Sequence, residues 1–73
     1  MRPELTVEIA SVPDREDVVA EVWAGTQQFA EIRRDGDSFV VQVFAPPDNS
    51  VWEFSFEQLL NSLKHARERL AEG

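Results

Sequence analysis

The chain has 73 residues, 42% of them hydrophobic and 29% charged, and its seven Lys and Arg against 14 Asp and Glu leave a net charge of −7. This length admits one domain, residues 1–73, which buries only about 60% of the surface that the unfolded chain exposes. The excess of acid argues against direct binding to nucleic acid, the lack of cysteine excludes disulfides and thiolate metal sites, and the lack of 18 consecutive apolar residues argues against a membrane span.

The N-terminal stretch, MRPELTVEIA, lacks the apolar run of a signal peptide, so we expect a cytoplasmic protein. Residues 4–10 alternate apolar and polar side chains, which is the period of a strand with one buried face. Residues 18–24 are rich in β-branched and aromatic side chains, and residues 28–34 alternate again. Gly25 and Thr26, between these two segments, predict a tight hairpin turn.

Asp35 and Gly36 are the next turn signal, and they predict a type I′ hairpin leading into a fourth strand over residues 38–45. The apolar side chains of this strand point to both faces, with Phe39, Val41 and Val43 on one and Val40 and Phe44 on the other. We therefore expect the helix to cover one face of the strand and a partner to cover the other.

Two prolines, at positions 46 and 47, end the fourth strand, and residues 52–54 suit a short fifth one. Ser55 is expected to cap a helix, because Gln58 stands three residues later in the capping-box pattern. The helix is expected from about Phe56 to Ala71, with Phe56, Leu59, Leu60, Leu63, Ala66 and Leu70 facing inward. The predicted fold is α+β, an antiparallel meander of four to five strands with one C-terminal α-helix packed on one face.

The sequence has no motif that predicts catalysis or metal binding. His65 is the only histidine, and its neighbours one helical turn away are Asn61 and Arg69, so a catalytic triad of nucleophile, base and acid is excluded without a second chain. The carboxylates of residues 14–17 lack the ligand spacing and turn glycine of a calcium loop. Glu21 and Glu31 suit acid and base work by position, but so small a domain rarely encloses a substrate. We expect no enzyme, no metal and no cofactor.

Seven aromatic rings are more than one face of a short sheet needs. Trp23 and Glu21 are expected on the face away from the helix, beside Phe29, Glu31 and Arg33 of the neighbouring strand. An aromatic ring surrounded by charges is the usual composition of a protein-binding patch. The alternative is that Trp23 belongs to the core, and the same alternative holds for Trp52.

Near the helix, we expect Phe54 and Phe56 to hold the helix to the sheet. Trp52, which follows a turn, is then the surface anchor. The residues predicted to contact a partner are Glu21, Trp23, Glu31, Asp35, Asp37, Asp48 and Trp52.

From VPDRED, which begins at residue 12, to the RERL that ends at residue 70, the chain resembles small acidic bacterial proteins with a W-E-F-type entry to a terminal helix. Some of these are immunity proteins of polymorphic or contact-dependent toxin systems. The resemblance implies a cognate inhibitor that occludes a toxin's active site. Because nucleases that bind nucleic acid are often basic, an acidic body would be steered to them quickly. The expected partner is thus a basic protein.

Two other functions suit the same sequence. One is a homodimeric structural or accessory domain, with Val40 and Phe44 in the interface between its copies. The other is a phage-type inhibitor of a host defence complex that binds nucleic acid, because the same acidic surface would bind its basic surface.

Overall fold

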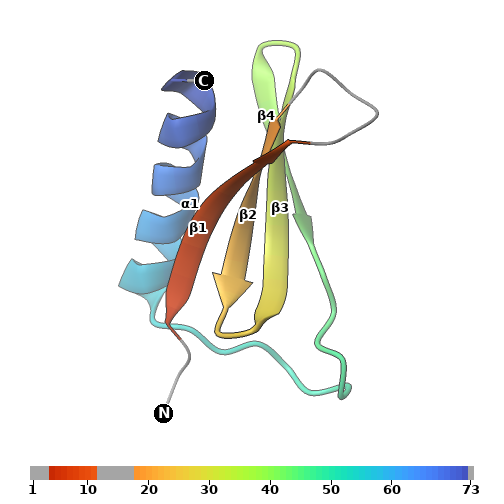
Figure 1. Ribbon diagram of the computed structural model, residues 1–73. Helices are drawn as coiled ribbons and strands as arrows, with labels where there is room; N and C mark the ends of the chain where they lie inside the picture. The colour runs from red at the N-terminus through yellow and green to blue at the C-terminus, as the bar shows by residue number, and fades with distance from the viewer. Residues whose placement is uncertain (1–3, 12–17, 73) are drawn as a thin grey trace.

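A computed structural model describes residues 4–11 and 18–72 of the chain (Figure 1). Its elements are β1 (Leu5–Ser11), β2 (Val18–Ala24), β3 (Gln27–Asp35), β4 (Ser38–Val43) and α1 (Phe56–Glu72). The four strands form one antiparallel sheet in the order β1-β2-β3-β4, and α1 lies on one face of it. The α+β meander with a C-terminal helix is therefore confirmed.

The face of the sheet that α1 covers holds the core. Pairing places Val7 of β1 opposite Val22 of β2, and Val22 opposite Ala30 of β3, so their side chains share this face. Val22 and Ala30 are fully buried, and Ile32 is 2% exposed. The predicted alternation of β1 is confirmed, because Leu5 is part of the buried core and Val7 and Ile9 pack against it.

Both hairpins turn on a glycine. The loops between paired strands are Gly25–Thr26 and Gly36–Asp37, and in each only the glycine has a positive φ, 64° and 62°. A positive φ at the first central residue alone fits a type II′ turn, which favours glycine there. The first turn is as predicted. The second was wrong by one residue and in type, because Asp35 remains in β3 and pairs with Ser38.

Helix α1 begins at the predicted residue. The backbone N–H of Gln58 donates to Ser55 Oγ over 3.4 Å, which satisfies one of the free donors of the first turn. The buried residues of the helix are Ser62, Ala66 and Leu70. The spacing of four residues and the two small side chains bring the helix close to the sheet over its second half.

Two of the inward-facing helix residues were predicted wrongly. Phe56 is 74% exposed and Leu60 is 37% exposed, whereas Ser62, which was not predicted, is buried. The helix is rotated so that the line of Ser62 and Ala66 meets the sheet, and this rotation moves Leu60 to the side of the helix and Phe56 out into solvent.

Residues 44–55 run below the sheet from β4 to α1 and form no fifth strand (Figure 1). Instead, Trp52 and Phe54 pack on Phe29, with ring centroids 5.4 Å and 4.7 Å from the Phe29 ring and both pairs edge to face. Phe29 was expected on the other face. It is the extra residue of a β-bulge, since Val22 pairs with Ala30 but Trp23 with Gln28, and the bulge turns its ring into the core.

Replacing Ile32 with alanine should lower the free energy of unfolding by about 2 to 5 kcal/mol, because it opens a cavity between β3 and α1. Urea unfolding followed by circular dichroism measures the change. The matched control is Val41→Ala, whose side chain is 46% exposed next to Ile32 in the sheet and should cost less than about 1 kcal/mol. Equal losses in the two variants would place the core elsewhere.

Candidate functional site

Three glutamates lie side by side on the face of the sheet that α1 leaves open. Glu8 of β1 pairs with Glu21 of β2, Glu21 pairs with Glu31 of β3, and the next position on β4 is Gln42. Directly paired residues have their Cβ atoms about 4.5 to 5.5 Å apart, so each carboxylate lies next to another. None of these pairings supplies a basic partner. We call Glu8, Glu21 and Glu31 the carboxylate row.

Trp23 lies beside the carboxylate row. It pairs with Thr6 on one side and Gln28 on the other, and it is half-buried. Its indole Nε1 donates a hydrogen bond to Glu21 Oε1 over 3.2 Å. The prediction that Trp23 and Glu21 share the face away from the helix is confirmed. The hydrogen bond holds the Nε1 edge of the indole next to Glu21 on the open face of the sheet.

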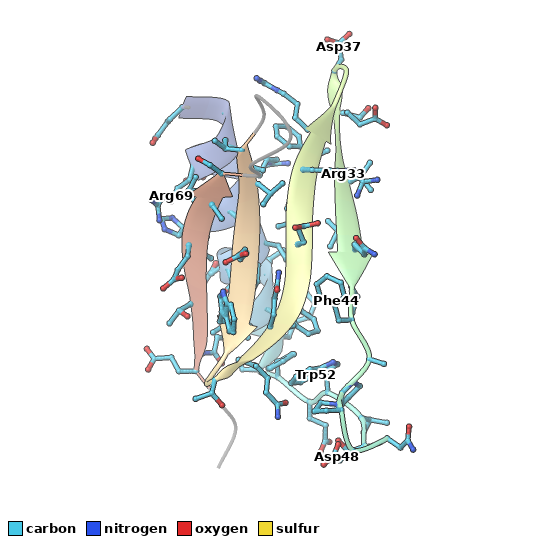
Figure 2. All side chains as sticks on the ribbon, turned by 45° about the vertical axis from the view of Figure 1, so that its right-hand side comes forward. Arg33, Asp37, Phe44, Asp48, Trp52 and Arg69 are labelled. Carbon is cyan, nitrogen blue, oxygen red and sulfur yellow. The ribbon has the colours of Figure 1, made fainter. Side chains whose placement is uncertain are left out.

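The β3–β4 hairpin extends the acidic face, but not continuously. Glu31, Arg33 and Asp35 follow one another on the same side of β3, so a basic residue stands between two acidic ones along this face. Asp37 stands exposed at the tip of the turn (Figure 2). Arg34 points to the other face, where its Cζ lies 5.7 Å from the centre of the Phe39 ring.

The remaining two predicted contact residues lie at the other end of the molecule from Asp37 (Figure 2). Trp52 is half-buried, and its Nε1 donates to the carbonyl oxygen of Phe44 over 2.8 Å. Its ring also stacks on Phe54, with centroids 5.7 Å apart. The expectation of Trp52 as a surface anchor is therefore at odds with its packing, because both its polar atom and its ring have internal partners.

Asp48 organises the turn before Trp52. Its Oδ1 accepts hydrogen bonds from the Ser50 hydroxyl, over 2.6 Å, and from the Ser50 backbone N–H, over 3.1 Å. These bonds stabilise the charged carboxylate and hold the pKa of Asp48 below its ordinary value. Asn49 between them has a left-handed φ of 60°. Asp48 thus has a local structural role, and its contact with a partner stays a prediction.

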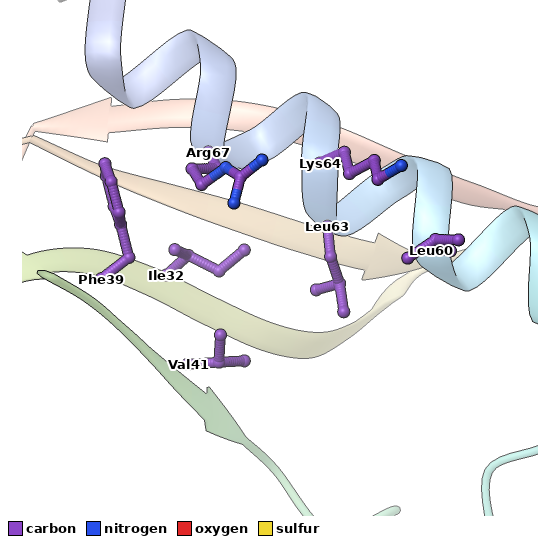
Figure 3. Close-up of a pocket in the computed structure, with 7 residues that line it drawn as sticks. All are labelled: Ile32, Phe39, Val41, Leu60, Leu63, Lys64 and Arg67. Atoms are coloured by element: carbon purple, nitrogen blue, oxygen red, sulfur yellow. The ribbon is translucent and has the colours of Figure 1, made fainter.

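A groove that the sequence did not predict lies on the helix face, between α1 and β4 (Figure 3). Its volume is about 320 Å³. Its lining residues are Ile32, Phe39, Val41, Leu60, Leu63, Lys64 and Arg67. The exposed apolar side chains of β4 are Val41 and Val43, which are 46% and 58% exposed, whereas Val40 of the expected dimer interface is half-buried. The uncovered face of β4 is therefore the one that was expected to lie under the helix.

Other kinds of site find no support in residues 4–11 and 18–72. No group of three or more His, Asp or Glu side chains there is arranged to hold a metal ion, and no helix there is long and apolar enough to cross a bilayer. His65 is exposed on α1. The acidic residues of 14–17 lie outside the described part of the chain.

Comparison of the chain with models of protein families, with curated proteins and with solved structures gave no match. The likeness to immunity proteins therefore rests on the sequence pattern alone.

Trp52→Phe should lower the free energy of unfolding by about 1 to 2 kcal/mol, because the Phe44 carbonyl loses its donor while a ring is kept in the cluster. Trp23→Phe is the control. It removes a donor from a carboxylate on the open face, which water can replace, so its loss should be smaller. Urea titration of both variants decides between them, and a larger loss for Trp23→Phe would contradict the assignment of Trp52 to the core.

Proposed function

We propose that the chain is a small protein-binding module that places its open sheet face on a basic surface of another protein. The observation that carries the proposal is the carboxylate row. Like charges directly opposite one another in a sheet destabilise it, by roughly 0.2 to 1 kcal/mol for each pair. A fold of this size gains nothing from two such pairs in isolation. A row of carboxylates is useful when a cationic surface neutralises it.

The charge of the whole chain supports the same partner. With a net charge of −7, the chain attracts basic proteins over a distance set by the ionic strength and speeds their encounter. Proteins that handle nucleic acid carry such basic surfaces where the phosphates bind. A protein that covers this surface with carboxylates competes with the nucleic acid. The mode of action that follows is inhibition by occlusion.

Trp23 supplies the apolar part of the same surface. Tryptophan is enriched among the residues that dominate binding energy, above all near the centre of an interface. Its indole is already oriented by Glu21, so little conformational freedom is lost on binding. An immunity protein against a toxin and a phage inhibitor of a host complex would both use such a surface, and both belong to the proposed class.

The experiment is a pull-down with the tagged chain from an extract of its source organism, at low and at moderate salt, with mass spectrometry of what is retained. We expect a basic protein at equal stoichiometry that is lost as salt rises. Trp23→Ala should weaken binding of the purified partner by more than about 2 kcal/mol, a factor of about 30. Glu31→Gln should weaken it less and reduce the salt dependence.

The matched control is Glu68→Gln, which removes one carboxylate from the exposed side of α1 and should leave the affinity unchanged. Urea unfolding of Trp23→Ala separates a lost contact from a lost fold. Recovery of the bait alone, or equal effects of Glu31→Gln and Glu68→Gln, would overturn the proposal.

A further inference from the structure

The face of the sheet that carries α1 is only partly covered. The helix packs on β1 and β2 and less on β3, and β4 has little contact with it. Val41 and Val43 of β4 therefore stay 46% and 58% exposed, although their side chains point to the same face as the core. The groove of about 320 Å³ occupies this position, beside α1 and above β3 and β4.

The position of the groove suits a second helix beside α1. Its floor is formed by side chains of β3 and β4, including Ile32 and Val41, and its wall by Leu60 and Leu63 of α1 (Figure 3). Helices pack side by side with their axes about 8 to 10 Å apart, so a second helix next to α1 would lie over the uncovered strands. The six residues of β4 span about 20 Å, which a helix of about 13 residues matches.

A strand suits the groove less well. A strand added to the free edge of β4 would extend the sheet in its own plane and leave the floor of the groove uncovered. A second copy of the chain also fits poorly. The described part of the chain has one helix, and its apolar side already lies against its own sheet, while Asn61, His65 and Glu68 are exposed. Two copies placed groove to groove with helix facing helix would also bring Lys64 and Arg67 of each against those of the other.

The charge around the groove selects the chemistry of the partner. Lys64 and Arg67 line it from the helix, and the guanidinium of Arg34 lies over the ring of Phe39, which also lines it. Three of the seven bases of an otherwise acidic chain thus gather at one apolar groove. A helix with an apolar stripe and flanking Asp or Glu side chains would fill the floor and pair with these bases.

We propose that the groove between α1 and β4 binds an amphipathic helix of a partner protein, one whose apolar stripe is flanked by acidic side chains. This surface lies on the opposite side of the sheet from the carboxylate row, and its partner has the opposite charge. The two surfaces are independent, so the chain can hold an acidic helix and a basic protein at the same time.

The test uses the full chain labelled with ¹⁵N and ¹³C and two synthetic helical peptides of about 14 residues. The first has leucine at every third or fourth position and glutamate on both flanks of that stripe, and the second has lysine in place of each glutamate. We expect the acidic peptide to shift the NMR signals of Val41, Leu60 and Leu63, and to leave Glu21 unchanged. The basic peptide should bind at least tenfold more weakly.

Two variants sharpen the result. Val41→Glu should weaken binding of the acidic peptide more than tenfold, and because Val41 is 46% exposed the variant should keep the circular dichroism spectrum of the parent chain. Arg67→Glu should shift the preference towards the basic peptide without touching the floor. Trp23→Ala should have no effect, which separates this surface from the open face.

Three outcomes would overturn the proposal. The first is that neither peptide shifts the NMR signals of the groove residues. The second is that both peptides bind equally. The third is self-association of the chain through the groove. Sedimentation of the chain alone should show a monomer. A dimer that Val41→Glu abolishes would mean that a second copy covers the groove.

Discussion

One helix lies on a sheet of four strands, and the rest of the structure follows from this mismatch in width. A helix with its side chains is about 10 to 12 Å across, whereas four strands about 4.8 Å apart need more cover than that. Helix α1 covers the half formed by β1 and β2 and reaches β3. The core is accordingly concentrated in β2 and β3, where Ala20, Val22 and Ala30 are fully buried. Strand β4 completes the sheet but supplies no buried residue to the core.

The segment that follows β4 packs against β3 and so stabilises the part of the sheet that α1 leaves uncovered. The bulge at Phe29 turns its ring towards Trp52 and Phe54, and the indole of Trp52 is hydrogen-bonded to the carbonyl of Phe44, just after β4. Phe44 in turn donates its backbone N–H to Phe29. These contacts join the chain that follows β4 to β3. Arg69 acts in a similar way at the other edge, where it donates to the carbonyl oxygen of Val7 in β1.

Much of the fold could be predicted because it rests on local patterns. Alternation predicted β1 and β3, the β-branched and aromatic residues of 18–24 predicted β2, and Ser55 with Gln58 marked the start of α1. Gly25 and Gly36 marked both turns, although the second lies one residue later than predicted. The errors arose where tertiary packing decides. The rotation of α1 exposes Phe56, and the bulge moves the Phe29 ring to the helix face. The groove depends on where the helix lies across the sheet, which the periodicity of the sequence does not predict. Of the candidate site, the placement of Glu21, Trp23 and Glu31 on one face followed from the period of two alone.

The two faces of the sheet contribute to stability with opposite sign. Apolar burial on the helix face stabilises the fold, whereas the carboxylates on the open face repel one another. We propose that the carboxylate row opposes folding and serves binding. The most direct measurement is urea unfolding of Glu21→Gln and the parent chain at low and at high salt, with Glu53→Gln as the control outside the sheet. Glutamine keeps an oxygen for the Trp23 indole. The account predicts that Glu21→Gln is more stable by about 0.5 to 1 kcal/mol at low salt and that salt screens this gain away. A less stable variant, or a gain that salt leaves unchanged, would contradict it.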